Sequence, residues 1–315
     1  MSAETDFIAA LRHIANDPIA RGLNDDAAVL DDLVLTHDMI VEGVHFLPED
    51  PPGDVAWKLV AVNLSDLAGK GAWPIAVLLG YTLAGDPAWD EAFLKGLADV
   101  LARFGVALAG GDTVAVPAGT PRTLGLTAIG RASTAQIPAR AGASPGDMLF
   151  VAGTIGDAGA GLAIARGHVS GPTPLLEAYR RPVPLLDVGR ALAPHVTAMM
   201  DVSDGLLIDA SRLAEASGVA LEIDLDRVPL SPALIDHQGE DRESRLRAAV
   251  AGDDYALLFT ASGTSEVRLL GICEPFRVRL TRVGAVANGT GLALRDRDGM
   301  VPLPGRLGYE HGTDG

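Results

Sequence analysis

Aspartates recur beside strongly apolar segments of this sequence, and carboxylates are the groups here best suited to chemistry. Asp38 follows the apolar run at residues 33–35, Asp66 lies in the apolar stretch DVAWKLVAVNLSDLAGKG, and Asp112 follows a short apolar run at residues 106–109. Further acidic residues lie near segment ends at Asp25, Asp26, Asp201, Asp204, Asp253 and Asp254. Most aspartates in proteins are caps, turns or solvated surface residues, but this pattern predicts that several of these converge on one site.

Converging carboxylates need positive charge. Two carboxylates about 5 Å apart repel each other by roughly 3 kcal/mol at an effective dielectric of about 20. Several such pairs would exceed the net stability of a typical domain, which is roughly 5–15 kcal/mol. Because the sequence has no cysteine or histidine cluster that would suit zinc, all-oxygen ligation predicts Mg²⁺.

Two glycine-containing motifs are candidates for phosphate binding. GTIGDAGAG at residues 153–161 follows an expected strand and precedes an expected helix, a placement that suits either phosphate or a tight packing turn. It does not match G-x-G-x-x-G, and G-x-x-x-x-G-K-[ST] is absent, so a dinucleotide fold and a P-loop kinase are disfavoured. GGDT at residues 110–113 places backbone N–H groups beside a carboxylate.

Two single residues have open interpretations. His45 is one of seven histidines and is either a substrate donor or base, or a structural residue. Arg140 lies in the segment PARAGA and is either solvated or a phosphate clamp. No G-x-S-x-G elbow is present, so a Ser-His-Asp triad is not expected.

The composition excludes several classes of partner and location. The net charge of −16 disfavours nucleic acid and anionic membranes, and the most apolar stretch, residues 73–83, is too short to cross a bilayer. The N-terminal segment lacks the basic start and apolar core of a signal peptide. The single Cys273 cannot form an internal disulfide, which predicts a reducing, cytoplasmic setting.

The order of expected elements predicts two α/β (α+β) domains. In the first part we expect strands at residues 27–30, 33–38, 74–83, 106–109 and 122–130, with helices at 54–69, where Asp54 would be the N-cap, and 88–104. The composition shifts to Pro, Gly, Ala and Arg near residues 133–146. We therefore predict an N-terminal domain at residues 1–136 and a C-terminal domain at residues 137–315.

Six phrases in this order resemble the thiamine-monophosphate kinase family: NDDAAVL, THDMIVEGVHF, NLSDLAGKGA, GGDT, DVSDGL and AGDDYALLF. That family belongs to a superfamily with aminoimidazole ribonucleotide synthetase and selenophosphate synthetase. The resemblance covers roughly residues 5–311. It implies a two-domain fold, a homodimer formed through the N-terminal sheet, and phosphorylation of thiamine monophosphate by ATP with several Mg²⁺ ions.

The resemblance also implies ligands, position by position. The family's metal ligands match Asp26, Thr36, His37, Asp38, Asp66, Asp112, Asp201 and Asp204. Its nucleotide-binding positions match Gly111, Asp112, Arg140 and Ser203, and its substrate-binding positions match His45, Asp253 and Tyr309. Asp38, Asp66 and Asp112 are the expected catalytic residues, which would hold Mg²⁺ for direct in-line transfer.

The sequence departs from the family pattern at four positions. Asn24 replaces a usual Gly, His37 replaces Thr, Asp253 replaces Glu, and Ala256 replaces a second Glu. Two alternatives follow: another ATP-dependent synthetase of the superfamily, or a non-catalytic nucleotide-binding dimer. A selenophosphate synthetase would have a reactive cysteine near its N-terminus and a hydrogenase-maturation relative a terminal one, whereas the only cysteine is Cys273.

Overall fold

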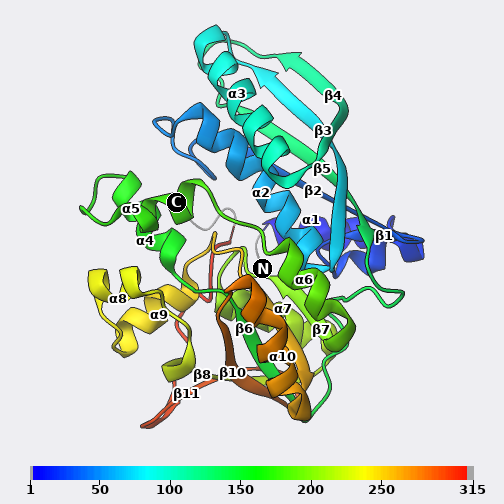
Figure 1. Ribbon diagram of the computed structural model, residues 1–315, viewed down its shortest axis with the longest axis vertical. Helices are drawn as coiled ribbons and strands as arrows, with labels where there is room; N and C mark the ends of the chain where they lie inside the picture. The colour runs from blue at the N-terminus through cyan, green and yellow to red at the C-terminus, as the bar shows by residue number, and fades with distance from the viewer. Residues whose placement is uncertain (1–2, 311–315) are drawn as a thin grey trace.

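The computed structural model describes residues 3–310, which form two sheets with helices packed on them (Figure 1). The chain starts with helix α1 and a 3₁₀ turn, Ala3–Arg12 and Pro18–Leu23. The five strands of the first sheet, in spatial order β1-β2-β5-β3-β4, are Ala28–Leu30, Leu33–Val41, Thr123–Ala132, Ala72–Leu83 and Ala107–Ala115.

Two helices, α2 (Pro52–Gly69) and α3 (Pro87–Phe104), cover one face of this sheet. Helix α2 is buried around most of its circumference, as its near-continuous apolar sequence predicts. The expected N-cap at Asp54 is wrong: the helix starts at Pro52, which lacks an N–H to be capped, and Asp54 lies in the first turn. Helix α3 ends at Gly105 in the left-handed conformation, as glycine permits.

The opposite face of the first sheet has no helix over it among the described residues. The apolar side chain of Met39 is 50% exposed there, and that of Leu78 is 39% exposed. All nine residues of β4, at the sheet edge, are exposed. The expected end of this strand at residue 109 is wrong, because GGDT pairs with β3 in parallel register and the strand continues to Ala115.

The second sheet has seven strands in the order β12-β11-β8-β10-β6-β9-β7. In that order they are Gly299–Val301, Gly291–Asp296, Ala220–Asp224, Leu280–Ala287, Asp147–Ala152, Leu257–Ser262 and Ala198–Asp201. Along β6, Leu149 and Val151 join one hydrophobic core while Phe150 and Ala152 join the other. The sheet is therefore buried on both faces, which explains its continuous apolar strands.

Helices flank this sheet. They are α4 (Asp157–Ala165), α5 (Thr173–Arg180), α6 (Leu186–Leu192), α7 (Leu206–Ser217), α8 (Pro232–Gln238), α9 (Arg242–Val250) and α10 (Glu266–Cys273). Sequence patterns missed α5, because prolines at its start suggested a loop, and they missed α10. In the part of the chain described, no helix is long and apolar enough to cross a membrane.

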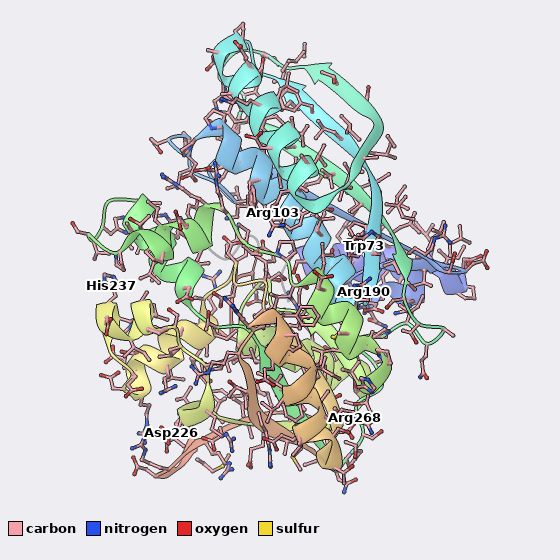
Figure 2. All side chains as sticks on the ribbon, in the orientation of Figure 1. Trp73, Arg103, Arg190, Asp226, His237 and Arg268 are labelled. Atoms are coloured by element: carbon pink, nitrogen blue, oxygen red, sulfur yellow. The ribbon has the colours of Figure 1, made fainter. Side chains whose placement is uncertain are left out.

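The two sheets are joined through α2, which packs on α6 and β7. A Cβ on Gly69 would lie 3.1 Å from the backbone nitrogen of Asp201, and one on Gly189 would lie 2.0 Å from the carbonyl oxygen of Ala68. At the same boundary the guanidinium of Arg190 lies 5.0 Å from the ring centre of Trp73 (Figure 2). The close backbone contacts of α2 with α6 and β7 therefore fix the position of the first domain relative to the second.

Candidate active site

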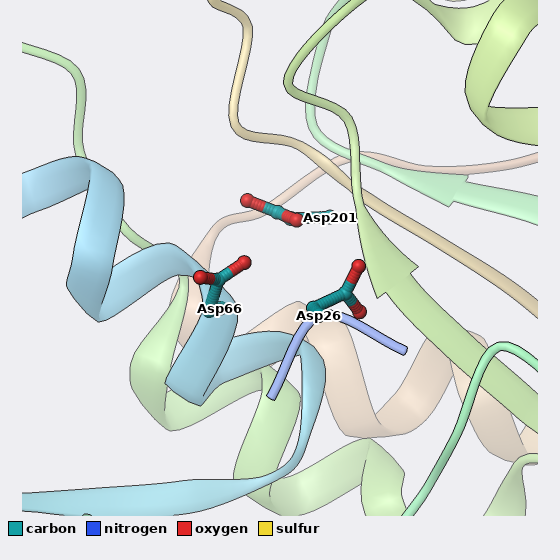
Figure 3. A group of neighbouring side chains, drawn as sticks. All are labelled: Asp26, Asp66 and Asp201. Carbon is teal, nitrogen blue, oxygen red and sulfur yellow. The ribbon is translucent and has the colours of Figure 1, made fainter. Parts of the chain in front are cut away.

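Three carboxylates from separate parts of the chain converge where the two domains meet. Asp26 lies just before β1, Asp66 on α2 and Asp201 at the end of β7, and their side chains point toward one another (Figure 3). One carboxylate oxygen from each lies within 4.8 Å of the others. An all-carboxylate donor set of this size fits Mg²⁺ or another oxygen-seeking divalent ion.

Strand β2 and helix α2 build the next part of the site. The hydroxyl of Thr36 donates a short hydrogen bond to the carboxylate of Asp66. The backbone N–H of Asp38 donates to the side-chain oxygen of Asn63, at 2.9 Å. Asn63 and Asp66 are three residues apart, so both face β2, as their helical spacing predicts.

Burial and mutual repulsion make it unfavourable for all the carboxyl groups of this site to be ionised at once. Burial, followed by the nearby charges of Asp26 and Asp204, raises the pKa of Asp38 to about 6. Burial and the charge of Asp26 raise the pKa of Asp201 to about 8. Burial and the charge of Asp38 hold the pKa of Asp66 well above its usual range. We call Asp26, Asp38, Asp66 and Asp201 the carboxylate cluster. Its mutual repulsion is what bound cations would relieve.

The stability of the metal-free protein should depend on pH. Above pH 3.8, folded Asp38 up to about pH 6 and folded Asp201 up to about pH 8 each retain a proton that the unfolded chain has released. The free energy of unfolding should therefore fall as pH rises through this window, by on the order of several kcal/mol. Calorimetry in a chelator should show Tm falling from pH 5 to pH 8, and saturating Mg²⁺ should flatten the profile. A Tm that rises with pH in the chelator would contradict this.

A second group of contacts places protein cations on one side of the cluster. The guanidinium of Arg140 lies 2.5 Å from the Asp26 carboxylate, and the Lys70 ammonium lies 2.5 Å from both Asp25 and Asp26. Arg21 lies 2.5 Å from Asp25. Burial raises the pKa of Asp25, but the charges of Lys70 and Arg21 outweigh it and leave that pKa lowered.

The loop after β7 carries two of the predicted ligands, Ser203 and Asp204. The carboxylate of Asp204 forms an ion pair with Arg212 at 2.5 Å, and its charge helps raise the pKa of Asp38. The backbone N–H groups of Ser203 and Asp204 both donate to buried Asp209 at 3.0 Å. The backbone N–H of Tyr309 donates to the carbonyl oxygen of Asp204. Asp209 therefore fixes this loop beside the carboxylates.

A buried lysine brings together two predicted substrate ligands. The ammonium of Lys58 lies 2.7 Å from the carboxylate of Asp253 and donates to the carbonyl oxygen of His45 at 3.0 Å. Asp253 has φ 69° and Tyr255 has φ 51°, which is unusual for residues with side chains. The Tyr255 hydroxyl donates to Asp253 at 2.9 Å, which helps hold this strained loop.

A cavity of about 540 Å³ adjoins this loop. Its lining includes the Trp57 ring, Asp253, Glu177 and Asp157, and Arg181 is the one basic residue among the described residues that line it. The cavity is thus acidic and has an aromatic wall, which suits a cationic, ring-containing ligand.

Three predicted metal or nucleotide ligands lie away from the carboxylate cluster of their own chain: Asp112, Gly111 and His37. Across the first sheet, Asp112 pairs with Gly80 of β3, Gly80 with Gly125 of β5, and Gly125 with Met39 of β2. Asp112 is therefore on the uncovered face, roughly 14 Å along the sheet from β2, while Asp38 faces α2. Gly111 shares this strand.

His37 is the third. Its Nδ1 lies 2.9 Å from the Thr127 hydroxyl on the uncovered face, so only its backbone remains as a ligand on the cluster side.

The glycine-containing segment at residues 153–161 is a packing turn. The carboxylate of Asp254 accepts hydrogen bonds from the backbone N–H of Gly156 at 2.7 Å and of Ala158 at 3.4 Å. A Cβ on Gly156 would lie 2.4 Å from the side chain of Ala248. The N-terminus of α4 is thus capped by the protein's own carboxylate, which favours the packing interpretation over phosphate binding.

Sequence reasoning missed the positioning residues Lys58, Lys70 and Asp209, and it counted Asp25 among the acidic residues without giving it a role of its own. One signal was available: the chain has only three lysines, and two of them lie in or directly after an apolar helix. A lysine in such a segment needs a buried anionic partner.

Comparison with known families identifies both domains. Residues 24–132 match the model of the AIR synthase related protein N-terminal domain, and residues 144–297 match that of its C-terminal domain. The interval between the two matches contains the predicted domain boundary at residues 136–137, which itself stays a prediction.

Curated and solved relatives cover nearly the whole chain. The thiamine-monophosphate kinase of Caulobacter vibrioides is 40% identical over 98% of this chain and 91% of its own. The crystal structure of thiamine-monophosphate kinase from Stenotrophomonas maltophilia is 36% identical, with a TM-score of 0.77 over 92% of this chain and 94% of that one. A structure titled AaThiL complexed with AMPPCP and TMP has a TM-score of 0.84 at 29% identity, over 98% and 97%. These matches confirm the two-domain fold, and the chain belongs to the thiamine-monophosphate kinase family of AIR synthase related proteins.

Proposed function

We propose that this protein transfers the terminal phosphoryl group of ATP to thiamine monophosphate, yielding thiamine diphosphate and ADP. The observation that carries the proposal is the convergence of Asp26, Asp66 and Asp201 at the domain boundary. The relative complexed with AMPPCP, an ATP analogue, and TMP supports the pair of substrates.

The chain's own residues account for most of the mechanism. We propose that the carboxylates of Asp26, Asp38, Asp66 and Asp201 hold Mg²⁺, which when bound supplies positive charge to phosphate oxygens. The attacking oxygen belongs to a phosphate already largely ionised near pH 7, so no general base is required. Positioning by both domains then supplies the in-line geometry.

The acidic cavity suits the other end of the acceptor. Thiamine carries a cationic thiazolium ring and a neutral aromatic pyrimidine ring. Glu177, Asp157 and Asp253 would face the cation, and the Trp57 ring offers a surface for stacking. Asp253 is one methylene shorter than the family's usual Glu, but Lys58 holds it at the cavity wall.

Replacing His45 with alanine should weaken thiamine monophosphate binding far more than ATP binding. The His45 ring accepts a hydrogen bond from the Val41 backbone N–H at 3.1 Å, and the His45 carbonyl oxygen accepts one from Lys58, which itself contacts Asp253. We expect KM for thiamine monophosphate to rise about tenfold or more while KM for ATP changes less than about twofold. His237→Ala, on α8, is the matched control, and equal effects on both substrates would refute the role of His45.

We also propose that the enzyme works as a homodimer joined through the uncovered face of the first sheet. Met39 and Leu78 expose apolar surface there, and β4 is a long exposed edge strand, both of which disfavour an isolated monomer. Asp112 lies on that face. We propose that Asp112 of the partner subunit completes the metal site.

A cytoplasmic location and the absence of nucleic acid and membrane partners stay predictions from the composition. Cys273 is buried, and burial raises the pKa of its thiol to about 11, so it is an inert structural residue. This fits a reducing compartment without requiring it.

The direct test is incubation with ATP, Mg²⁺ and thiamine monophosphate, with products read by mass. We expect thiamine diphosphate and ADP in equal amounts. Nucleotide binding without turnover would instead support a non-catalytic dimer, and transfer to another acceptor would support a different synthetase.

A further inference from the structure

Lys70 is a fully buried lysine in direct contact with the carboxylate cluster. It directly follows α2, and its side chain has no exposed surface. Its ammonium lies 2.5 Å from Asp25 Oδ1 and 2.5 Å from Asp26 Oδ2, and donates to the carbonyl oxygen of Met199 at 3.0 Å. The ammonium thus has two carboxylates as ion-pair partners and one backbone carbonyl as a hydrogen-bond acceptor.

The protein's own cations are distributed unevenly over the cluster. Lys70 and Arg21 contact Asp25, and Lys70 and Arg140 contact Asp26. No lysine or arginine of the described chain forms an ion pair with Asp38, Asp66 or Asp201. The cluster therefore has one side neutralised by side chains and one side that is open to added cations.

The Lys70 ammonium also ties together the two domains of the site. Met199 lies on β7, two residues before Asp201, while Asp25 and Asp26 lie before β1. One ammonium group thus fixes Asp26 relative to the strand that carries Asp201. Removing it would leave two buried carboxylates with one cation fewer, an arrangement that a folded protein tolerates poorly.

We propose that Lys70 is a built-in cation of the metal site, which occupies the place of a divalent ion beside Asp25 and Asp26. It is a positioning residue. It holds Asp26 next to Asp66 and Asp201, which have no lysine or arginine ion-pair partner among the described residues and would bind the exchangeable divalent ions. This inference rests on the metal site proposed above, but its test separates the two.

The test is Mn²⁺ binding without nucleotide, followed by the electron paramagnetic resonance signal of free Mn²⁺. The native chain should bind Mn²⁺, and failure to do so would overturn both the metal site and the role of Lys70. Lys70→Met should bind at least one additional Mn²⁺ per chain, or bind Mn²⁺ roughly tenfold more tightly, because one positive charge has been removed. Native-like or weaker binding would overturn the role of Lys70 and leave the metal site standing.

A charge-matched double variant is the control. Lys70→Met with Asp25→Asn removes one positive and one negative charge, so its Mn²⁺ binding should return to the native value. If extra binding persists in the double variant, local loosening rather than charge is responsible, and the proposal is wrong. Lys70→Met should be purified with Mn²⁺ throughout: folding only in Mn²⁺ supports the proposal, and failure to fold even then overturns it.

Discussion

Replacing Asp66 with asparagine should abolish turnover while leaving the fold intact. Asp66 lies among Asp26, Asp38 and Asp201, and the Thr36 hydroxyl that donates to it can donate equally to an amide oxygen. An amide is a far weaker Mg²⁺ ligand than a carboxylate, so we expect kcat to fall by about 10³-fold or more. Steady-state kinetics at saturating substrates measures this.

Stability distinguishes a lost ligand from a damaged fold. Because a neutral amide at this position would relieve repulsion among carboxylates, the metal-free Tm of Asp66→Asn should equal or exceed that of the native chain. Asp147→Asn is the matched control: Asp147 is a buried aspartate on β6 that accepts hydrogen bonds from Ser144 and Thr197, away from the cluster. It should lose stability but keep its turnover. Native turnover in Asp66→Asn would remove Asp66 from the metal site.

Mixing two inactive variants should restore activity if the site is shared between subunits. Asp66→Asn and Asp112→Asn are each expected to be inactive as homodimers. In a mixed dimer one site carries both substitutions and the other carries neither, provided that Asp112 acts on the partner's cluster. Random pairing after co-refolding should then recover about a quarter of native activity.

The converse outcome is equally definite. If Asp112 acted within its own chain, no mixed dimer would contain an intact site, and activity would stay at the level of the separate variants. Light scattering of the refolded mixture should show dimers, and a monomeric native protein would contradict the proposed interface. Val267, 83% exposed on α10, offers a control surface, because Val267→Asp should affect neither assembly nor activity.

The sequence predicted the parts of this site that depend on local pattern. The apolar run before Asp38 and the spacing of Asn63 and Asp66 on α2 place those residues as expected. The resemblance of six sequence motifs to one family predicted the two-domain fold, which the family matches confirm. The site roles themselves stay predictions until tested.

Local sequence patterns do not show how far apart two segments lie in the folded chain. Asp112 follows an apolar run much as Asp38 does, yet the strand order puts it three strands away and its register puts it on the other face. GGDT looked like a loop, because glycines are rare in strands, but backbone pairing with β3 overrides that preference. The apolar surroundings of Lys58 and Lys70 indicate buried anionic partners, but only the fold shows which distant carboxylates those partners are.

The most direct measurement is anomalous diffraction from crystals grown with Mn²⁺ and a non-hydrolysable ATP analogue. We expect Mn²⁺ peaks among the carboxylates of Asp26, Asp66 and Asp201, with analogue phosphates bound to the same ions. Ordered analogue with no Mn²⁺ at these carboxylates would contradict the claim that the cluster holds divalent ions against the nucleotide.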